Sequence, residues 1–141
     1  MAKVIDVAEY ILSKSGKMST WKLQKLVYYS QAWHLVWDDK PLFTANIQAW
    51  ANGPVVPQLY HMHKGNFSVT SLAGAPDKLK DSERETIDTV LAHYGKKSPD
   101  YLSQLTHLEN PWRHARKGVP DGERSGNVIS HESMAEYYAG L

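Results

Sequence analysis

The chain has 141 residues, of which 42% are hydrophobic, 22% charged and 11% aromatic, with a formal net charge of +1 at pH 7. This composition excludes disordered and collagen-like proteins, and the length suits a single domain over residues 1–141, because domains commonly have about 100 to 200 residues. The balanced charge gives no general attraction to phosphate, so nucleic acid is not the expected partner. The absence of cysteine excludes disulfide scaffolds, thiol nucleophiles and thiolate zinc sites.

The sequence shows no targeting or membrane signal. Residues 1–6 lack the apolar region of a secretory signal peptide. No stretch approaches the roughly 20 apolar residues that span a bilayer. We therefore expect no membrane contact and a cytoplasmic location.

The first two predicted helices follow directly from capping signals. One begins at Asp6, with Glu9 completing a capping box, and ends at Gly16. Ser19 is the predicted N-cap of a longer helix over about residues 19–38. Apolar residues cover this second helix nearly all round, and such a helix is buried on nearly all sides. We therefore expect it to be the central element of the core, with Gln24 and Gln31 as a narrow polar flank.

Shorter elements follow the long helix. Residues 41–43 and 47–50 are predicted to be extended, and Asn52, Gly53 and Pro54 to form a turn. Loops are expected at 68–76, with one edge strand at Val69, and at 118–126. Further helices are predicted over residues 58–64, 82–94, 98–109, 112–117 and 130–141. The predicted fold is mainly α: a compact domain of about six helices around the buried helix 19–38, with a minor two- or three-stranded β element.

Motifs typical of common enzymes are absent from the sequence. It contains no phosphate-binding G-x-x-x-x-G-K-[ST] or G-x-G-x-x-G, no zinc-binding H-E-x-x-H and no G-x-S-x-G nucleophile elbow. His61 and His63 are two residues apart, so on a helix they point in different directions and do not share a metal. We predict no catalytic residue, no cofactor and no metal site. An enzyme that acts through carboxylates and the histidines His61, His107 and His114 remains an alternative.

A DNA-binding protein is a second alternative, because the first two helices have the spacing of a helix-turn-helix motif. Four lysines gather around them: Lys14, Lys17, Lys22 and Lys25. A recognition helix presents polar side chains to base edges, whereas this helix carries Trp21, Tyr28 and Tyr29. The sequence therefore favours a protein-binding module over a transcriptional regulator.

Several motifs together resemble a known family. Residues 22–34 read K-L-Q-K-L-V-Y-Y-S-Q-A-W-H, and residues 40–43, K-P-L-F, come next. They are followed by I-x-A-W at 47–50 and G-P-V-V-P at 53–57. In this order and spacing the motifs resemble the Panacea domain of SocA-like antitoxins, a family that includes phage-associated GepA-like proteins. The resemblance spans nearly the whole chain.

The resemblance implies an antitoxin of a type II toxin–antitoxin pair. Such a protein neutralises a cognate toxin, encoded by an adjacent gene, by binding it directly and without catalysis. Blocking of the toxin's active site and delivery of the toxin to a protease are both compatible with the sequence. We expect the partner to bind at the turn and the helix after it, unless these residues only support the core: Trp50, Asn52, Gly53, Pro54, Tyr60, His61 and Lys64.

Overall fold

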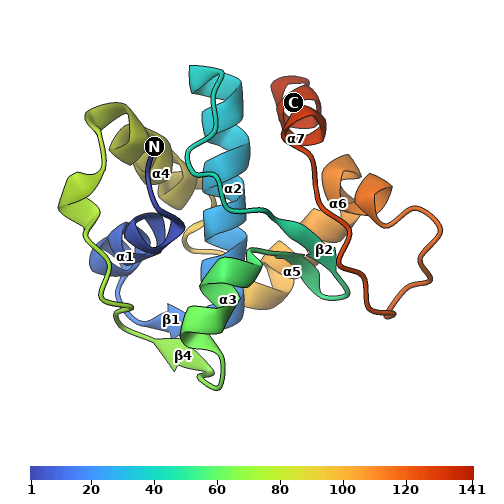
Figure 1. Ribbon diagram of the computed structural model, residues 1–141, viewed down its shortest axis with the longest axis horizontal. Coiled ribbons are helices and arrows are strands. Elements are labelled where there is room, and N and C mark those ends of the chain that lie inside the picture. Colours follow the sequence, from blue (N-terminus) through green and yellow to red (C-terminus); the bar gives the residue numbers. More distant parts are fainter.

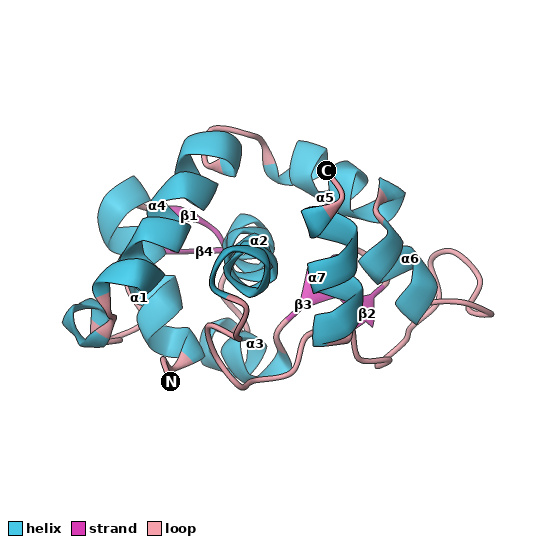
Figure 2. Ribbon diagram, turned by 90° about the horizontal axis from the view of Figure 1, so that it is seen from above, coloured by secondary structure: helices cyan, strands magenta, loops and turns pink.

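Helix α2, Thr20–Asp38, runs through the middle of the computed structural model, which describes residues 1–141. Figure 1 shows it upright at the centre, and Figure 2 shows it end-on between two groups of helices. On one side pack α1 (Val4–Ser15) and α4 (Asp81–Tyr94). The opposite side is covered by α5 (Pro99–Leu108) and α7 (His131–Ala139), with α6 (Asn110–Ala115) packed against both. The predicted mainly α fold around a central helix is confirmed.

Each predicted helical segment has a counterpart in the structure. Helix α3 (Pro57–His63) corresponds to the helix predicted at 58–64, the α-helices number seven, and a short 3₁₀ helix covers Pro76–Lys78. None of the helices combines the length and the apolar character that crossing a membrane requires.

The minor β structure consists of two separate antiparallel pairs. β1 (Met18–Ser19) pairs with β4 (Ser68–Val69), so the edge strand predicted at Val69 lies beside the start of α2. β2 (Gln48–Trp50) and β3 (Gly53–Val55) form a hairpin in which Trp50 lies opposite Gly53. This hairpin packs against α2 and α5. Its tip is Ala51 and Asn52, so the turn predicted at Asn52, Gly53 and Pro54 is wrong by one to two residues, because Gly53 and Pro54 pair with β2 as part of β3.

Burial of α2 is as extensive as the sequence predicts. The Ser19 hydroxyl accepts a hydrogen bond from the Lys22 N–H at 3.1 Å, which confirms the predicted cap. Thirteen of the 19 helix residues are buried. His34 is among them, with Nδ1 2.9 Å from the Lys40 carbonyl oxygen and Nε2 3.2 Å from the Asp38 carboxylate. The polar side chains of α2 must therefore find their partners inside the protein.

Two glutamines of α2 bind the backbone of the extended segments. The Gln24 amide accepts from the Val56 N–H at 2.9 Å and donates to the Val56 carbonyl at 3.3 Å. The Gln31 amide accepts from the Leu42 N–H at 2.6 Å and donates to the Phe43 carbonyl at 2.8 Å. Each glutamine thus supplies the hydrogen bonds that a neighbouring strand would provide. The four hydrogen bonds fix both ends of the segment that carries the β2–β3 hairpin.

A second polar network joins α2 to α7 and to the start of α6. The Tyr29 and Tyr138 hydroxyls both donate to Oε1 of Glu109, at 2.7 and 2.8 Å. The Tyr28 and Tyr138 hydroxyls lie 2.9 Å apart. Burial raises the pKa of Glu109, and the two tyrosine hydroxyls partly offset that effect. The network links the helices on one side of α2 through hydrogen bonds as well as apolar contact.

The predicted start of the first helix is wrong. α1 begins at Val4 rather than Asp6, and Asp6 does not cap it. The Asp6 carboxylate instead accepts from the Ala75 N–H at 2.8 Å, and Glu9 accepts from the N–H groups of Leu72 and Gly74. These backbone hydrogen bonds lower the pKa of Glu9, although burial alone would raise it. Both carboxylates therefore hold a distant loop in place.

Two details of the later helices affect the surface of the protein. α4 begins at Asp81, one residue before its predicted start, and Glu83 accepts a hydrogen bond from the N-cap, the Lys80 N–H, at 2.7 Å. In helix α5 only Leu102 and Thr106 are buried. Three large side chains in or after α5 and α7 are exposed: Tyr101, Leu108 and Leu141.

We predict that Gln24→Leu destabilises the protein by about 2 to 6 kcal/mol, because the buried Val56 N–H and the buried His63 ring, whose Nε2 lies 2.9 Å from the Gln24 amide, lose their partner and each unsatisfied group costs about 1 to 3 kcal/mol. Denaturation with urea measures this change. The matched control is Gln104→Leu on α5, where the side chain is exposed and the expected change is within about 0.5 kcal/mol. Equal stability of the Gln24→Leu variant and the wild type would contradict the anchoring role of Gln24.

Candidate functional site

The tip of the β2–β3 hairpin is held rigidly although it lies at the surface. Its backbone carbonyls accept hydrogen bonds from α5 and α6: Trp112 Nε1 donates to the Trp50 carbonyl at 2.8 Å and the Ser103 hydroxyl donates to the Asn52 carbonyl at 2.6 Å. The Arg116 guanidinium donates to the Ala49 carbonyl at 3.0 Å. A turn fixed in this way can present side chains without a large loss of conformational entropy on binding.

Three of the predicted site residues meet at one surface hollow of about 580 Å³. Trp50, Asn52 and Tyr60 line it, and the Trp50 and Tyr60 rings pack edge to face with centroids 5.0 Å apart. Trp21 from the start of α2 and Arg124 from the loop before α7 complete its walls. The structure thus brings together residues from β2, the turn and α3, as expected. We call this the aromatic hollow.

The other four predicted residues have different positions. Gly53 and Pro54 are buried in β3 and do not line the hollow. Gly53 has a φ of 131°, and a Cβ at this position would lie 2.4 Å from Cε of Lys25. Glycine is therefore required by its conformation and by the close approach of the lysine. His61 and Lys64 are exposed on and just after α3, outside the hollow.

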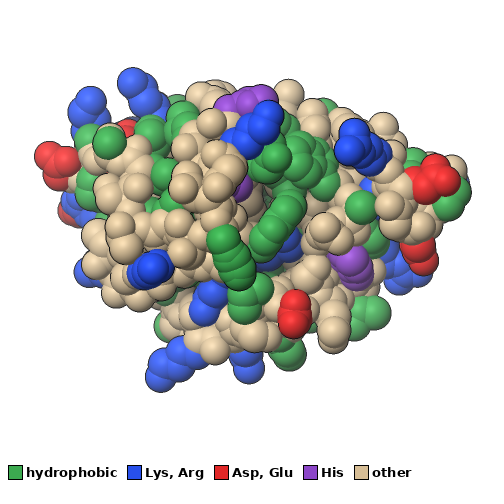
Figure 3. Space-filling view, turned by 90° about the horizontal axis from the view of Figure 1, so that it is seen from below, with side chains coloured by type: hydrophobic (Ala, Val, Ile, Leu, Met, Phe, Trp, Pro, Cys, Tyr) green, Lys and Arg blue, Asp and Glu red, His purple; other side chains and the backbone are tan.

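A second hollow, of about 430 Å³, adjoins the first and shares Trp21 and Asn52 with it. Figure 3 views the molecule from this end and shows hydrophobic side chains gathered around a central depression. Trp21 is 39% exposed and Phe67 is 73% exposed. Both rings line the second hollow, which we call the lysine pocket. The remaining lining residues besides Asn52 are Ser19, Lys25, Pro99, Asp100 and Ser103.

Lys25 is the unusual residue of this site. It is 1% exposed, yet its ammonium takes part in no ion pair, and its Nζ lies over the Trp21 ring, 5.4 Å from the centroid. Burial lowers the pKa of Lys25 to about 8. A buried charge without a partner is costly, because the protein interior solvates it poorly. In the sequence, Lys25 stands among four lysines that favoured DNA binding, and no local pattern marks it, Trp21 or Phe67 as part of a protein-binding site.

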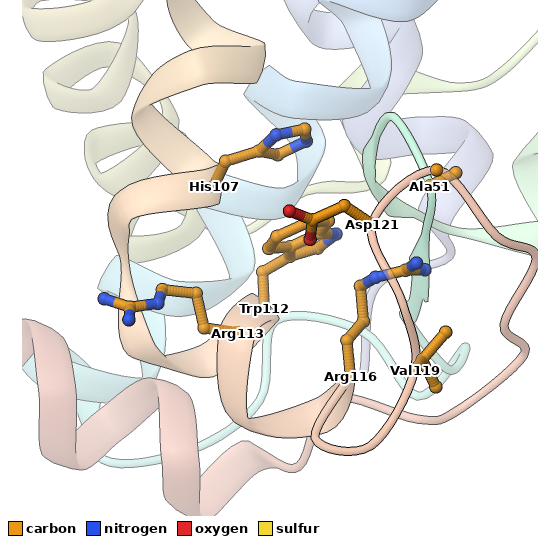
Figure 4. A pocket seen from close by; sticks show the side chains of 8 residues that line it. Ala51, His107, Trp112, Arg113, Arg116, Val119 and Asp121 are labelled. Atoms are coloured by element: carbon orange, nitrogen blue, oxygen red, sulfur yellow. The ribbon is translucent and has the colours of Figure 1, made fainter.

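A third hollow, of about 460 Å³, lies on the other side of the turn and is basic in character. Figure 4 shows Asp121 pointing over the Trp112 ring and Arg113 pointing away from Arg116. Arg116 is fully engaged, since it also donates to the Pro120 and Glu123 carbonyls. The guanidinium of Arg116 in this hollow is therefore used to hold backbone carbonyls of the protein itself.

The histidine of this third hollow, His107, stacks on Trp112 with ring centroids 4.0 Å apart. Burial lowers the pKa of His107, and the charges of Lys25 and Arg116 lower it further, whereas a hydrogen bond to the Asn52 backbone and the charge of Asp121 act in the opposite direction. A stacked histidine kept neutral in this way supports the wall of the hollow.

The arrangement does not offer a recognition helix for DNA. α2 is enclosed by helices on both sides, so it cannot enter a major groove. The four lysines that suggested DNA binding do not form one exposed group, because Lys25 is buried and Nζ of Lys14 lies 5.4 Å from the centre of the Tyr10 ring.

Comparison with known proteins gives two matches. The family described as "Antitoxin SocA-like, Panacea domain" matches residues 23–113, a segment that contains Lys25 and all seven predicted contact residues. The protein named "Antitoxin SocA" of Caulobacter vibrioides is 28% identical over 125 residues, which cover 75% of this chain and 66% of that protein. The chain thus spans just under two thirds of this relative's length. No solved structure matches the chain.

We predict that Lys25→Met stabilises the protein by about 2 to 3 kcal/mol at neutral pH, because the variant keeps the apolar volume and removes a poorly solvated charge. The folded-state pKa of about 8 lies below the ordinary value of 10.5, so the protonated lysine penalises folding fully below about pH 8. This penalty disappears as the pH rises from about 8 towards 10.5, and the advantage of the variant shrinks with it.

Urea denaturation at about pH 7 and about pH 9.5 measures both effects. Lys64→Met is the control, because Lys64 is exposed and its replacement should change stability by less than about 0.5 kcal/mol. A Lys25→Met variant less stable than the wild type at neutral pH would contradict the assignment.

Proposed function

Because the chain belongs to the family of SocA-like antitoxins with a Panacea domain, we propose that it binds and neutralises a cognate protein toxin. The observation that carries this proposal is the family match over residues 23–113. Residues 1–141 act as one antitoxin domain of a type II pair, and the toxin is encoded by an adjacent gene. The encounter is expected in the cytoplasm, and neutralisation requires no catalytic step by the antitoxin.

The geometry of the hairpin end supports protein binding. Tyrosine, tryptophan and arginine dominate the energetic centres of protein interfaces, and the aromatic hollow contains Trp21, Trp50, Tyr60 and Arg124. The end of the β2–β3 hairpin is fixed by three hydrogen bonds, one from α5, one from α6 and one from Arg116 just after α6. Preorganised aromatic side chains lose little freedom on binding, so they contribute more of their buried area to affinity.

The predicted contact residues divide into two roles in this proposal. Trp50, Asn52 and Tyr60 line the aromatic hollow and contact the toxin, and His61 and Lys64 lie at its margin on α3. Gly53 and Pro54 are buried, so they shape the turn from within and make no contact of their own.

We predict that cells expressing the open reading frame adjacent to this gene stop growing, and that co-expression of this protein restores growth. The two proteins should co-purify as a stable complex, because neutralisation acts by direct binding. Growth on inducing medium and affinity purification provide the two readouts. An adjacent product that is not toxic, or one whose toxicity persists without a complex, would count against the proposal.

We also predict that Asn52→Arg weakens toxin binding by at least about tenfold, since a long charged side chain at the junction of the aromatic hollow and the lysine pocket blocks both. Titration calorimetry with the purified toxin measures the change. Asn46→Arg makes the same chemical change at an exposed residue outside both hollows and should leave binding unaltered. Equal affinities of the two variants would place the interface elsewhere.

A further inference from the structure

The ammonium group of Lys25 lines an open pocket and has no partner within the chain. Two ion pairs are present in the structure, and Lys25 belongs to neither. Only 1% of the residue is exposed, so water reaches it through the lysine pocket alone. Most buried lysines are paired with a carboxylate, and an unpaired one is a costly feature that folding does not explain.

The surroundings hold this lysine in place. Cε lies 2.4 Å and Nζ 3.0 Å from the position that a Cβ of residue 53 would occupy, so Gly53 leaves the space through which the side chain passes. The Thr106 hydroxyl lies 3.3 Å from that same position. The side chain therefore runs in a narrow channel between β3 and α5, and its charged end is directed to the lysine pocket.

The charges around the pocket leave room for one anion. Asp100 lies on the rim at the start of α5, where it is exposed and makes no ion pair with Lys25. His107 on the same helix has a pKa lowered by burial and by Lys25 itself, so it is neutral at physiological pH. Lys22, one turn earlier on α2, is half-buried and lies outside the lining of the pocket. One cation in the pocket suits a single carboxylate better than a row of phosphates.

The rim of the pocket is apolar. Trp21 and Phe67 stand beside the opening with 39% and 73% of their surfaces exposed. When a partner covers these rings, water is excluded from the pocket, and the attraction between Lys25 and an incoming carboxylate becomes stronger because the local dielectric constant falls. An energetic centre surrounded by apolar contacts is typical of protein interfaces.

We propose that the lysine pocket receives the side-chain carboxylate of an aspartate or glutamate of the toxin, which pairs with the Lys25 ammonium. This inference rests on the proposed antitoxin function. The pocket continues through Trp21 and Asn52 into the aromatic hollow, so a toxin segment lying across both places its acidic side chain on Lys25 while neighbouring residues contact Trp50 and Tyr60. An extended trough of this shape suits a side chain within a segment better than a chain end.

The first test compares toxin binding by Lys25→Met and Lys40→Met antitoxin. We expect Lys25→Met to raise the Kd at least about tenfold, since a carboxylate would then enter the interface without a partner. Lys40→Met removes an exposed lysine beyond the opposite end of α2, outside both hollows, and should leave the Kd within about twofold of the wild type. Unfolding curves of both variants show that each is folded. A folded Lys25→Met variant that binds with wild-type affinity would overturn the proposal.

The second test uses the antitoxin alone with small probes. The ¹³C resonance of Lys25 Cε is followed by NMR during titration with N-acetylglutamic acid α-amide, which carries only the side-chain carboxylate. We expect a saturable shift at millimolar concentrations, and no shift with the uncharged N-acetylglutamine α-amide. A weaker response to N-acetylalanine would agree with a preference for side chains over chain ends. Equal shifts with the two amides, or none with either, would overturn the proposal.

The two levels of the account fail in different ways. If the antitoxin neither binds nor neutralises its toxin, the proposed function fails, whatever the probes show. If wild-type antitoxin neutralises the toxin and Lys25→Met does so equally well, the function stands and the carboxylate pocket is wrong.

Discussion

Extensive burial of α2 is the constraint on which the rest of this structure depends. Thirteen of its 19 residues are buried and have little access to water, so the polar side chains among them need partners within the protein. Gln24 and Gln31 meet this requirement by binding the backbone of the segments on either side of the β2–β3 hairpin. The position of the hairpin, and of the candidate site at its tip, follows from these two side chains.

Lys25 is the exception to this rule, and the exception lies at the candidate site. It is one residue from Gln24 on the same buried helix, but its charged end meets a pocket instead of a partner. Features that cost stability and have no structural benefit are common where a protein binds something. The antitoxin function gives this cost a reason, because the missing partner can be supplied by the toxin.

Local signals in the sequence predicted most of the helices correctly. Ser19, Ser98 and Ser130 cap their helices as expected, because capping involves residues only a few positions apart. Asp6 has the same local signal but is used by the loop around Ala75, more than 60 residues away. No pattern near Asp6 contains this information, since the choice depends on which segment packs against α1.

The same distinction applies to the candidate site. Trp50, Asn52 and Tyr60 are close in sequence and were correctly expected to lie near one another. Phe67 reaches the site because β4 pairs with β1, and the paired residues of these strands are about 50 positions apart in the sequence. Nothing near Lys25 in the sequence distinguishes it from a surface lysine, because its burial depends on the close approach of Gly53 from β3.

The central claim of this account is that the toxin covers the hairpin end of the molecule. Hydrogen–deuterium exchange of the antitoxin, free and in complex with its toxin, tests it most directly. We expect slower exchange in the complex at residues 50–53, 66–70 and 124–126, which surround the aromatic hollow and the lysine pocket. Protection confined to the outer faces of α1 and α4, with no change at the hairpin end, would contradict it.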